Sequence, residues 1–276
     1  MLRQFQSGNT RTGQRGFSMI ELSIAMLIAL FLLGGLVTLV IGTKRTTGTQ
    51  TAVSQLQDNQ RIAMTLITNV VQKAGYFPYP SPSAQSPAGQ TINSFLAETN
   101  LAGVTLPAGQ VLSGLYNAAA PGDRLAARFF APQTDPNNTI IDCAGQSNTS
   151  GSATFSYTNV FRVRTVNNVS WLQCETRSNN NGTLSAVLTV NLIPNVTQMS
   201  VLYGVGSNAA GSDYSVVQYL NASQMTATSW LNVTAVKVSL TFEVPVYGTT
   251  GGQMSTTQTS VFTRVIPVMA RAGVDT

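Results

Sequence analysis

The sequence contains no histidine and only two cysteines, and charged side chains make up just 9% of its 276 residues. Without histidine the chain cannot form a Ser-His or Cys-His catalytic pair, nor a zinc site that uses imidazole. No two carboxylates stand at a spacing typical of acid-base catalysis. These absences argue against an enzyme, and we expect no catalytic residue, no cofactor and no metal site.

Positive charge is concentrated at the start of the chain. The formal net charge is +5, but three arginines precede Gly16, and without them twelve basic and ten acidic residues remain. These three are Arg3, Arg11 and Arg15. The other basic residues are scattered, apart from Lys44-Arg45 and the Arg162/Arg164 pair. Two arginines on one strand face are too few for a nucleic-acid surface, so we expect a solvated sheet face there.

A long apolar run follows the basic start. Residues 17–41 contain a single charged residue, Glu21. As a helix the run would be about 37 Å long, which is enough to cross a bilayer. It is too long for the apolar core of a secretory signal, and no small-residue cleavage site follows it. Gly34-Gly35, in the middle of the run, either softens the helix or lets another helix pack closely.

Glu21 distinguishes this run from a plain signal anchor, which is the simplest alternative. A carboxylate near the centre of a bilayer span costs roughly 2.5–3.5 kcal/mol, and less near the interface. Glu21 therefore needs either a partner of opposite charge or a position at the solvated interface.

The pattern becomes amphipathic between residues 44 and 74, where apolar residues recur at spacings of three and four. One continuous helix over residues 17–74 would be about 87 Å long. Gly75 provides a natural C-terminal stop. Residues 78–90 contain four prolines and predict a loop.

After residue 121 strand-like segments alternate with turns rich in Asn, Gly and Ser. The predicted strands are 124–131, 154–166, 170–175, 184–192, 197–205, 233–246 and 260–268. Alternation is clearest over 236–242, where every second residue is apolar. We expect an α+β fold in which a long N-terminal helix, transmembrane and then amphipathic, packs on an antiparallel β-sheet domain.

Cys143 and Cys174 can pair only with each other. In a chain that leaves the cytoplasm, an even number of cysteines predicts a disulfide. Closing a loop of about 30 residues would contribute roughly 3.5–4 kcal/mol in the chain-entropy account. Two free buried thiols are the alternative.

The order of a basic leader, Gly16, Phe17 and Glu21 resembles the processing site of type IV prepilins. This resemblance implies that a peptidase cuts after Gly16 and methylates the new N-terminal Phe17. It also implies that Glu21, fifth in the mature chain, sets the register of assembly by pairing with the N-terminal amine of a neighbouring subunit.

Later segments resemble the PilW family of minor pilins, and together they extend from residue 15 to about residue 271. They are 57–63, 73–77, 122–125, 142–143, 172–174, 194–199, 202–205 and 230–240. The resemblance implies the pilin fold and a low-abundance subunit that primes or caps a type IV pilus. The implied divisions are a leader (1–16), a transmembrane helix (17–41), an amphipathic helix (42–75), a loop-rich connection (76–121) and a β-rich domain (122–276).

The resemblance also implies a location and partners. The chain would lie in the inner membrane with its domain in the periplasm, and later in the pilus or at the cell surface. Its partners would be other minor pilins, the major pilin, the prepilin peptidase, the inner-membrane assembly platform and membrane lipid. Nucleic acid is not an expected partner.

Three alternatives remain open at this point. A pseudopilin of type II secretion, of the GspJ kind, has a similar plan. The exposed domain would also suit a pilus-tip adhesin or a DNA-uptake receptor. A membrane-anchored periplasmic enzyme is the weakest alternative, because histidine is absent.

Overall fold

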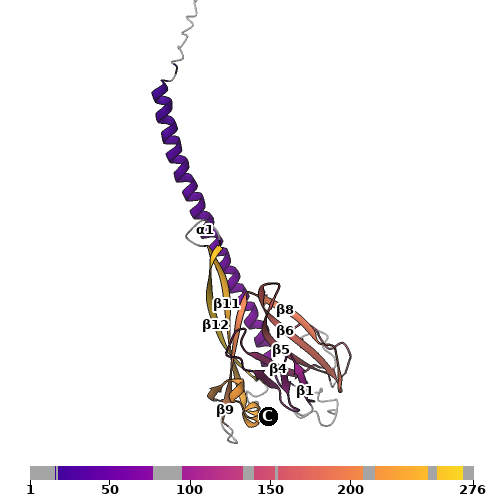
Figure 1. Cartoon of the computed structure of the whole chain (residues 1–276). Coiled ribbons are helices and arrows are strands. Elements are labelled where there is room, and N and C mark those ends of the chain that lie inside the picture. The colour runs from indigo at the N-terminus through magenta and orange to yellow at the C-terminus, as the bar shows by residue number, and fades with distance from the viewer. Residues whose placement is uncertain are drawn as a thin grey trace, which may run out of the picture.

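The computed structural model describes residues 16, 18–76, 95–132, 140–152, 155–207, 215–247 and 254–269. Its longest element is helix α1 (Met19–Gln72), which has 54 residues and a length of about 81 Å. The N-terminal half of α1 projects away from the rest of the protein, and the C-terminal half enters a β-rich domain (Figure 1). The predicted continuous helix is confirmed.

Helix α1 ends where the sequence predicts. Gly75 has a φ of +80°, in the left-handed region that favours glycine. Its amide donates a hydrogen bond of 2.9 Å to the carbonyl of Arg128, and the next amide, of Tyr76, bonds back to Lys73. The end of the helix is thereby fixed to the sheet that contains Arg128.

The larger of two main antiparallel sheets has the strand order β3-β4-β5-β6-β7, and β8 also pairs with β6. The strands are β3 (Leu112–Leu115), β4 (Arg124–Phe130), β5 (Phe155–Val166), β6 (Val169–Asn180), β7 (Thr183–Leu184) and β8 (Leu188–Pro194). A small hairpin, β1 (Glu98–Leu101) and β2 (Val104–Leu106), covers part of the outer face of this six-stranded sheet.

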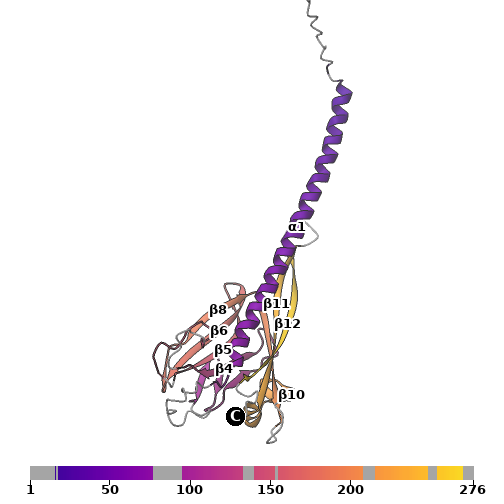
Figure 2. The same cartoon turned by 180° about the vertical axis from the view of Figure 1, so that it is seen from behind.

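The second sheet has four strands in the order β10-β9-β11-β12. They are β9 (Val196–Gly206), β10 (Val216–Leu220), β11 (Val233–Tyr247) and β12 (Met254–Pro267), and the short helices η2 (Ala222–Gln224) and α2 (Ala227–Leu231) precede β11. The C-terminal half of α1 packs on strands of both sheets, and both views place it between them (Figures 1 and 2).

The core forms where α1 meets the sheets. The helix residues buried in it are Ala63, Met64, Ile67, Thr68, Val70 and Val71, all in the C-terminal half. On β11, Val236, Val238, Leu240 and Phe242 are fully buried, whereas the residues between them are partly exposed. The predicted alternation is therefore confirmed, because one face of β11 belongs to the core that includes α1.

The strand prediction fails for short strands. β1, β2, β3 and β10 have five residues or fewer, too few to show a clear alternation. Three of them lie in the connection 76–121 that we expected to be loop-rich. The predicted strand 184–192 is divided between β7 and β8. The proline-rich residues 78–90, Phe17 and the residues before Gly16 lie outside the described residues.

A Gly-Asp pair joins the two sheets. Gly122 has a φ of +91°, and a Cβ atom there would lie 2.1 Å from the carbonyl oxygen of Met199 on β9. The next residue, Asp123, is buried, and its carboxylate accepts hydrogen bonds from the amides of Asn117 (2.8 Å) and Val201 (2.7 Å). The start of β4 is thus fixed to the neighbouring sheet.

The predicted disulfide is present. Cys143 and Cys174 are bonded, with their Cα atoms 6.3 Å apart, and both are buried. The bond ties the loop at 140–152 to the inner face of β6. Beside it, the buried carboxylate of Asp142 accepts hydrogen bonds from the amides of Ala144 and Gln146 and from the Thr176 hydroxyl.

Candidate assembly surface

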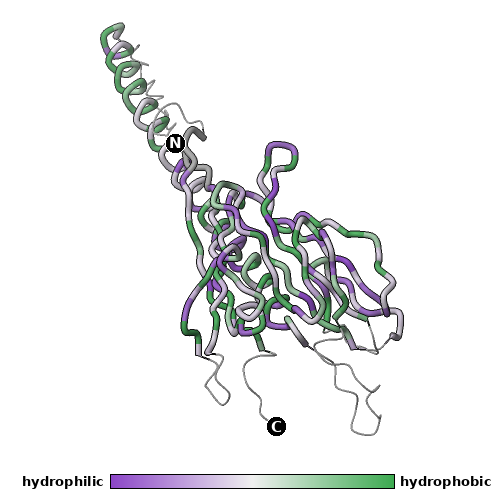
Figure 3. The backbone as a smooth tube through the Cα atoms, turned by 60° about the horizontal axis from the view of Figure 1, so that its bottom comes forward, coloured by the Kyte–Doolittle hydropathy of each residue, from purple (hydrophilic) through white to green (hydrophobic). Residues whose placement is uncertain are grey.

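The N-terminal half of α1 exposes a continuous apolar surface. Its large apolar side chains are between 43% exposed, at Ile41, and 89% exposed, at Met19. They lie on all sides of the helix, which is coloured as mostly hydrophobic beyond the domain (Figure 3). By length and composition α1 could cross a membrane. A surface of this size needs lipid or other apolar helices around it.

Hydroxyl groups in this half are satisfied within the helix. The Ser23 hydroxyl donates to the carbonyl of Met19 (3.0 Å), and the Thr38 hydroxyl donates to those of Gly34 (2.7 Å) and Gly35 (2.9 Å). Such bonds let Ser and Thr lie in an apolar environment without an unpaired polar group. Thr38 is therefore compatible with a bilayer span.

Glu21 differs from these hydroxyls. It lies in the first turn of α1, where its amide bonds to the Ser18 carbonyl (3.0 Å). A carboxylate in the first turn interacts favourably with the helix dipole. Within the described part of the chain its side chain has no hydrogen-bond or ion-pair partner. The apolar surface thus carries one carboxylate that has no partner among the described residues.

Gly16 lies just before this first turn. It is exposed, and a Cβ added to it would meet no atom of the described residues within 4 Å. The site residues predicted from sequence therefore form two separate groups. Gly16 and Glu21 lie at the N-terminal tip of the helix, and Cys143 and Cys174 lie inside the domain.

The mid-span glycines pack against no other described part of the chain. A Cβ added to Gly34 or Gly35 would meet nothing within 4 Å, and the helix continues through both. Gly34, Thr38 and Gly42 follow one another at a spacing of four, so they lie on one face of α1. That face has room for the close approach of another helix.

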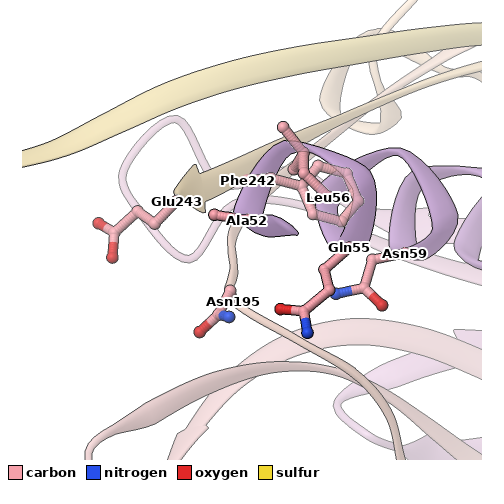
Figure 4. Close-up of a pocket in the computed structure, with 7 residues that line it drawn as sticks. All are labelled: Ala52, Gln55, Leu56, Asn59, Asn195, Phe242 and Glu243. Carbon is pink, nitrogen blue, oxygen red and sulfur yellow. The ribbon is translucent and has the colours of Figure 1, made fainter. Parts of the chain in front are cut away.

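A small pocket lies where α1 enters the domain (Figure 4). Its volume is about 60 Å³, and its lining consists of Ala52, Gln55, Leu56, Asn59, Asn195, Phe242 and Glu243. Asn195 forms the turn between β8 and β9, with a φ of +62°. In Figure 4 the amides of Gln55 and Asn59 lie near Asn195, while the Glu243 carboxylate points away. A pocket of this size is too small for an organic cofactor.

On the outer face of the six-stranded sheet, the expectation that Arg162 and Arg164 are both solvated is wrong for one of them. Arg162 does not lie on a solvated face: its side chain is 15% exposed and forms an ion pair with Glu175 on β6. The partner could not be found from sequence, because it depends on the pairing of β5 with β6. Arg164, two residues further on, is exposed as expected.

Arg128 has a structural role that the sequence did not reveal. Arg128 is 2% exposed, and its guanidinium donates hydrogen bonds to the carbonyls of Leu96 (2.5 Å), Pro107 (2.5 Å) and Gln110. It also lies 4.9 Å from the ring centre of Phe95. Burial lowers the pKa of Arg128 to about 10. This one side chain therefore holds the segment around β1 and β2 against the sheet.

Glu98 completes this cluster. Its side chain is 3% exposed, and its carboxylate pairs with Arg177 at 2.6 Å. Burial raises the pKa of Glu98, and the charge and hydrogen bond of Arg177 partly oppose that shift. Among the described residues no group of three or more acidic or cysteine side chains could hold a metal ion.

Comparisons with known proteins give two family matches. Residues 11–42 match the prokaryotic N-terminal methylation motif, and residues 160–268 match PilW, the type IV pilus-assembly protein W. A solved type IV-like pilin from Thermus thermophilus is similar, with a TM-score of 0.42 and 12% identity, over 79% of this chain and 97% of that one. No curated protein matches the sequence significantly.

The two matches fall on the two parts of the molecule. The methylation motif includes the exposed apolar half of α1, and the PilW match runs from β5 to the residue after β12. The resemblance drawn from the sequence is therefore confirmed. The chain is a type IV pilin-like protein in which an N-terminal methylation motif precedes a PilW domain.

Proposed function

We propose that the chain is a minor pilin that takes part in the assembly or initiation of a type IV pilus, in a complex at the pilus tip. The observation that carries this proposal is the exposed apolar half of α1, whose first turn has one carboxylate without a partner among the described residues. Such a helix is unstable in water but suits a bilayer and then a bundle of similar helices. The domain remains folded around the other half of α1 in either setting.

Processing at the N terminus is the first step of the proposed function. The peptidase cuts after Gly16, removes the basic leader and methylates Phe17. The exposure of Gly16, just before the start of α1, supports access by such an enzyme. The mature chain is then held in the inner membrane by residues 17–41, with the domain in the periplasm.

Glu21 sets the register of the helix against its neighbours. After cleavage the N-terminal amine of another subunit is a suitable counter-charge, and two opposite charges attract strongly in an apolar helix bundle. The other polar groups nearby support this role, because the Ser23 and Thr38 hydroxyls are already bonded within α1. The β-domain selects the partner subunits, which are other minor pilins and the major pilin.

Mass spectrometry of the mature N terminus tests the proposal. We expect the chain to begin with methylated Phe17 in a strain with an active prepilin peptidase. A Gly16→Val variant is the matched control, because a Cβ added at Gly16 meets no atom of the described residues within 4 Å. It should stay uncut with an unchanged domain. A wild-type chain that keeps its leader in such a strain would exclude the assignment.

A piliation assay separates the pilus from type II secretion, the alternative with the same plan. Deletion of the chain should reduce surface pili and twitching and leave protein secretion unchanged. The opposite result, with secretion lost and pili intact, would contradict the proposal and favour a type II secretion pseudopilin.

A further inference from the structure

Three arginines gather on the outer face of the six-stranded sheet. Arg162 and Arg164 alternate on β5 with the buried Phe161, so both point away from the core. Arg124 is on β4, where the pairing of Leu125 with Phe161 places it beside Arg162 on the same face. Like charges on neighbouring strands repel each other and destabilise a sheet. This arrangement therefore needs negative charge nearby.

The described residues provide only part of that charge. Glu175 pairs with Arg162, and Arg124 donates to the carbonyl oxygen of Ala102. The Nε atom of Arg162 is buried without an acceptor. Burial lowers the pKa of Arg162; Glu175 opposes this shift, and Arg164 and Arg124 add to it. With three guanidinium groups and one carboxylate, the cluster keeps a net charge of +2.

Arg164 is the accessible member of the cluster. It is exposed, and among the described residues it has no hydrogen-bond or ion-pair partner. Trp171, half-buried, lies directly opposite on β6. A guanidinium binds a carboxylate through two parallel hydrogen bonds, and an adjacent indole limits the access of water. The guanidinium of Arg164 is thus accessible to a carboxylate from another molecule.

We propose that Arg164, with Arg124 and Arg162 behind it, is an anion site that binds a carboxylate side chain of a neighbouring pilin-like subunit. The anion site follows from the cluster alone, and its occupant rests on the proposed function. Charge complementarity supports this occupant: the chain itself exposes Asp58 on α1 and Glu243 on β11, and neither has an ion-pair partner among the described residues. A neighbour of the same plan would offer similar carboxylates.

Nucleic acid fits the cluster less well than a single carboxylate. Binding to nucleic acid takes several phosphate contacts in a row. Here Glu175 lies within the cluster, and the other two arginines of the same face, Arg128 and Arg177, are bound to groups of their own chain. One exposed guanidinium remains, which suits one carboxylate.

The two tryptophans provide a readout. Trp171 lies at the site, and Trp230 packs on Tyr203 with a ring distance of 4.6 Å. In the full-length Trp230→Phe variant in detergent, Trp171 is the only indole. We would titrate this protein with a short Glu-rich peptide and with its Gln-containing counterpart. The Glu peptide should give a saturable change in Trp171 fluorescence that salt weakens, and the Gln peptide should give none.

Two further variants identify the residue responsible. Arg164→Gln should weaken binding of the Glu peptide about tenfold or more, as expected when one charge-assisted pair is lost. Arg264→Gln is the matched control, because Arg264 is exposed on β12, in the other sheet. If Trp230→Phe does not fold, the Trp171 indole N–H resonance of the wild-type protein gives the same readout.

Several results would overturn the proposal: no response to the Glu peptide, an equal response to both peptides, unchanged affinity in Arg164→Gln, or a preference for a DNA oligonucleotide over the Glu peptide. The proposed function fails separately. An unprocessed N terminus would exclude the pilin assignment without affecting this titration, and a failed titration would leave the N-terminal processing unaffected.

Discussion

The two halves of α1 form one continuous helix in two different environments. Large apolar side chains of the N-terminal half are at least 43% exposed, whereas Met64 and Ile67 in the C-terminal half are fully buried. The buried residues of the C-terminal half lie on one face of the helix, which strands of its own chain cover. The N-terminal half is apolar on all sides, and the described part of the chain does not cover it. Helix formation is common to both halves, and burial within the chain distinguishes them.

The largest effect is expected for a substitution in the C-terminal half, if packing of that half provides the folding stability. Ile67→Ala removes a fully buried side chain and should lower the free energy of unfolding by about 2–5 kcal/mol. Leu33→Ala, at a position that is 56% exposed, should change it by less than about 0.5 kcal/mol. Urea denaturation of both full-length variants in detergent measures the difference. Equal losses would mean that the two halves are not energetically distinct.

A second comparison concerns the contacts between the two sheets on which the C-terminal half packs. Asp123→Ala leaves the exposed amide of Asn117 and the buried amide of Val201 without their acceptor, and the loss at Val201 should cost about 1–3 kcal/mol. Asp58→Ala, at an exposed position on α1, is the control and should have little effect. A loss below about 0.5 kcal/mol in Asp123→Ala would contradict the role of Asp123 in joining the sheets.

A smaller effect is expected in the pH dependence of folding stability, to which a buried carboxylate contributes more than an exposed one. Burial raises the pKa of Asp142, and its hydrogen bonds only partly oppose the shift. The folded protein therefore holds this proton more tightly than the unfolded chain, in which the pKa is about 3.9. The stability gained from the proton is fully present below that value and is lost as pH rises through the higher folded pKa.

Asp142→Asn should flatten this part of the stability curve. The Asn side chain oxygen can still accept from Ala144 and Gln146, so the fold should persist. Denaturation midpoints measured between about pH 3 and pH 7 would give the slope. Asp58→Asn, on the exposed helix surface, should leave the slope as in the wild type. An unchanged slope in Asp142→Asn would contradict the assigned shift.

The parts of the fold that could be predicted are those with long regular patterns. Helix α1 follows from an apolar run and an amphipathic run that join without a break, and β11 follows from its strict alternation. β1 and β2 are too short for such a pattern. Their position depends on Arg128 and Arg124, whose carbonyl partners are 18 to 32 residues away in the chain. Contacts of this kind are not readable from sequence alone.

The same limit applies to the candidate sites. Gly16, Phe17 and Glu21 lie within six residues of one another, so the local order of residues is enough to select them. The interpretation of Arg162 was wrong because its partner, Glu175, comes from the next strand. Arg164 is a candidate binding residue only because the strand register places Arg124 and Trp171 near it. Side chains that meet across strands need the structure.

The most direct test of the central claim is the incorporation of a Glu21→Gln variant into pili. The claim is that the exposed half of α1 is the assembly surface, and that Glu21 is the charge on this surface that needs a partner. The variant should be cut and methylated normally, should unfold at the wild-type denaturant concentration, and should be lost from purified pili, while Asp58→Asn is incorporated normally. Normal incorporation of Glu21→Gln would contradict the account.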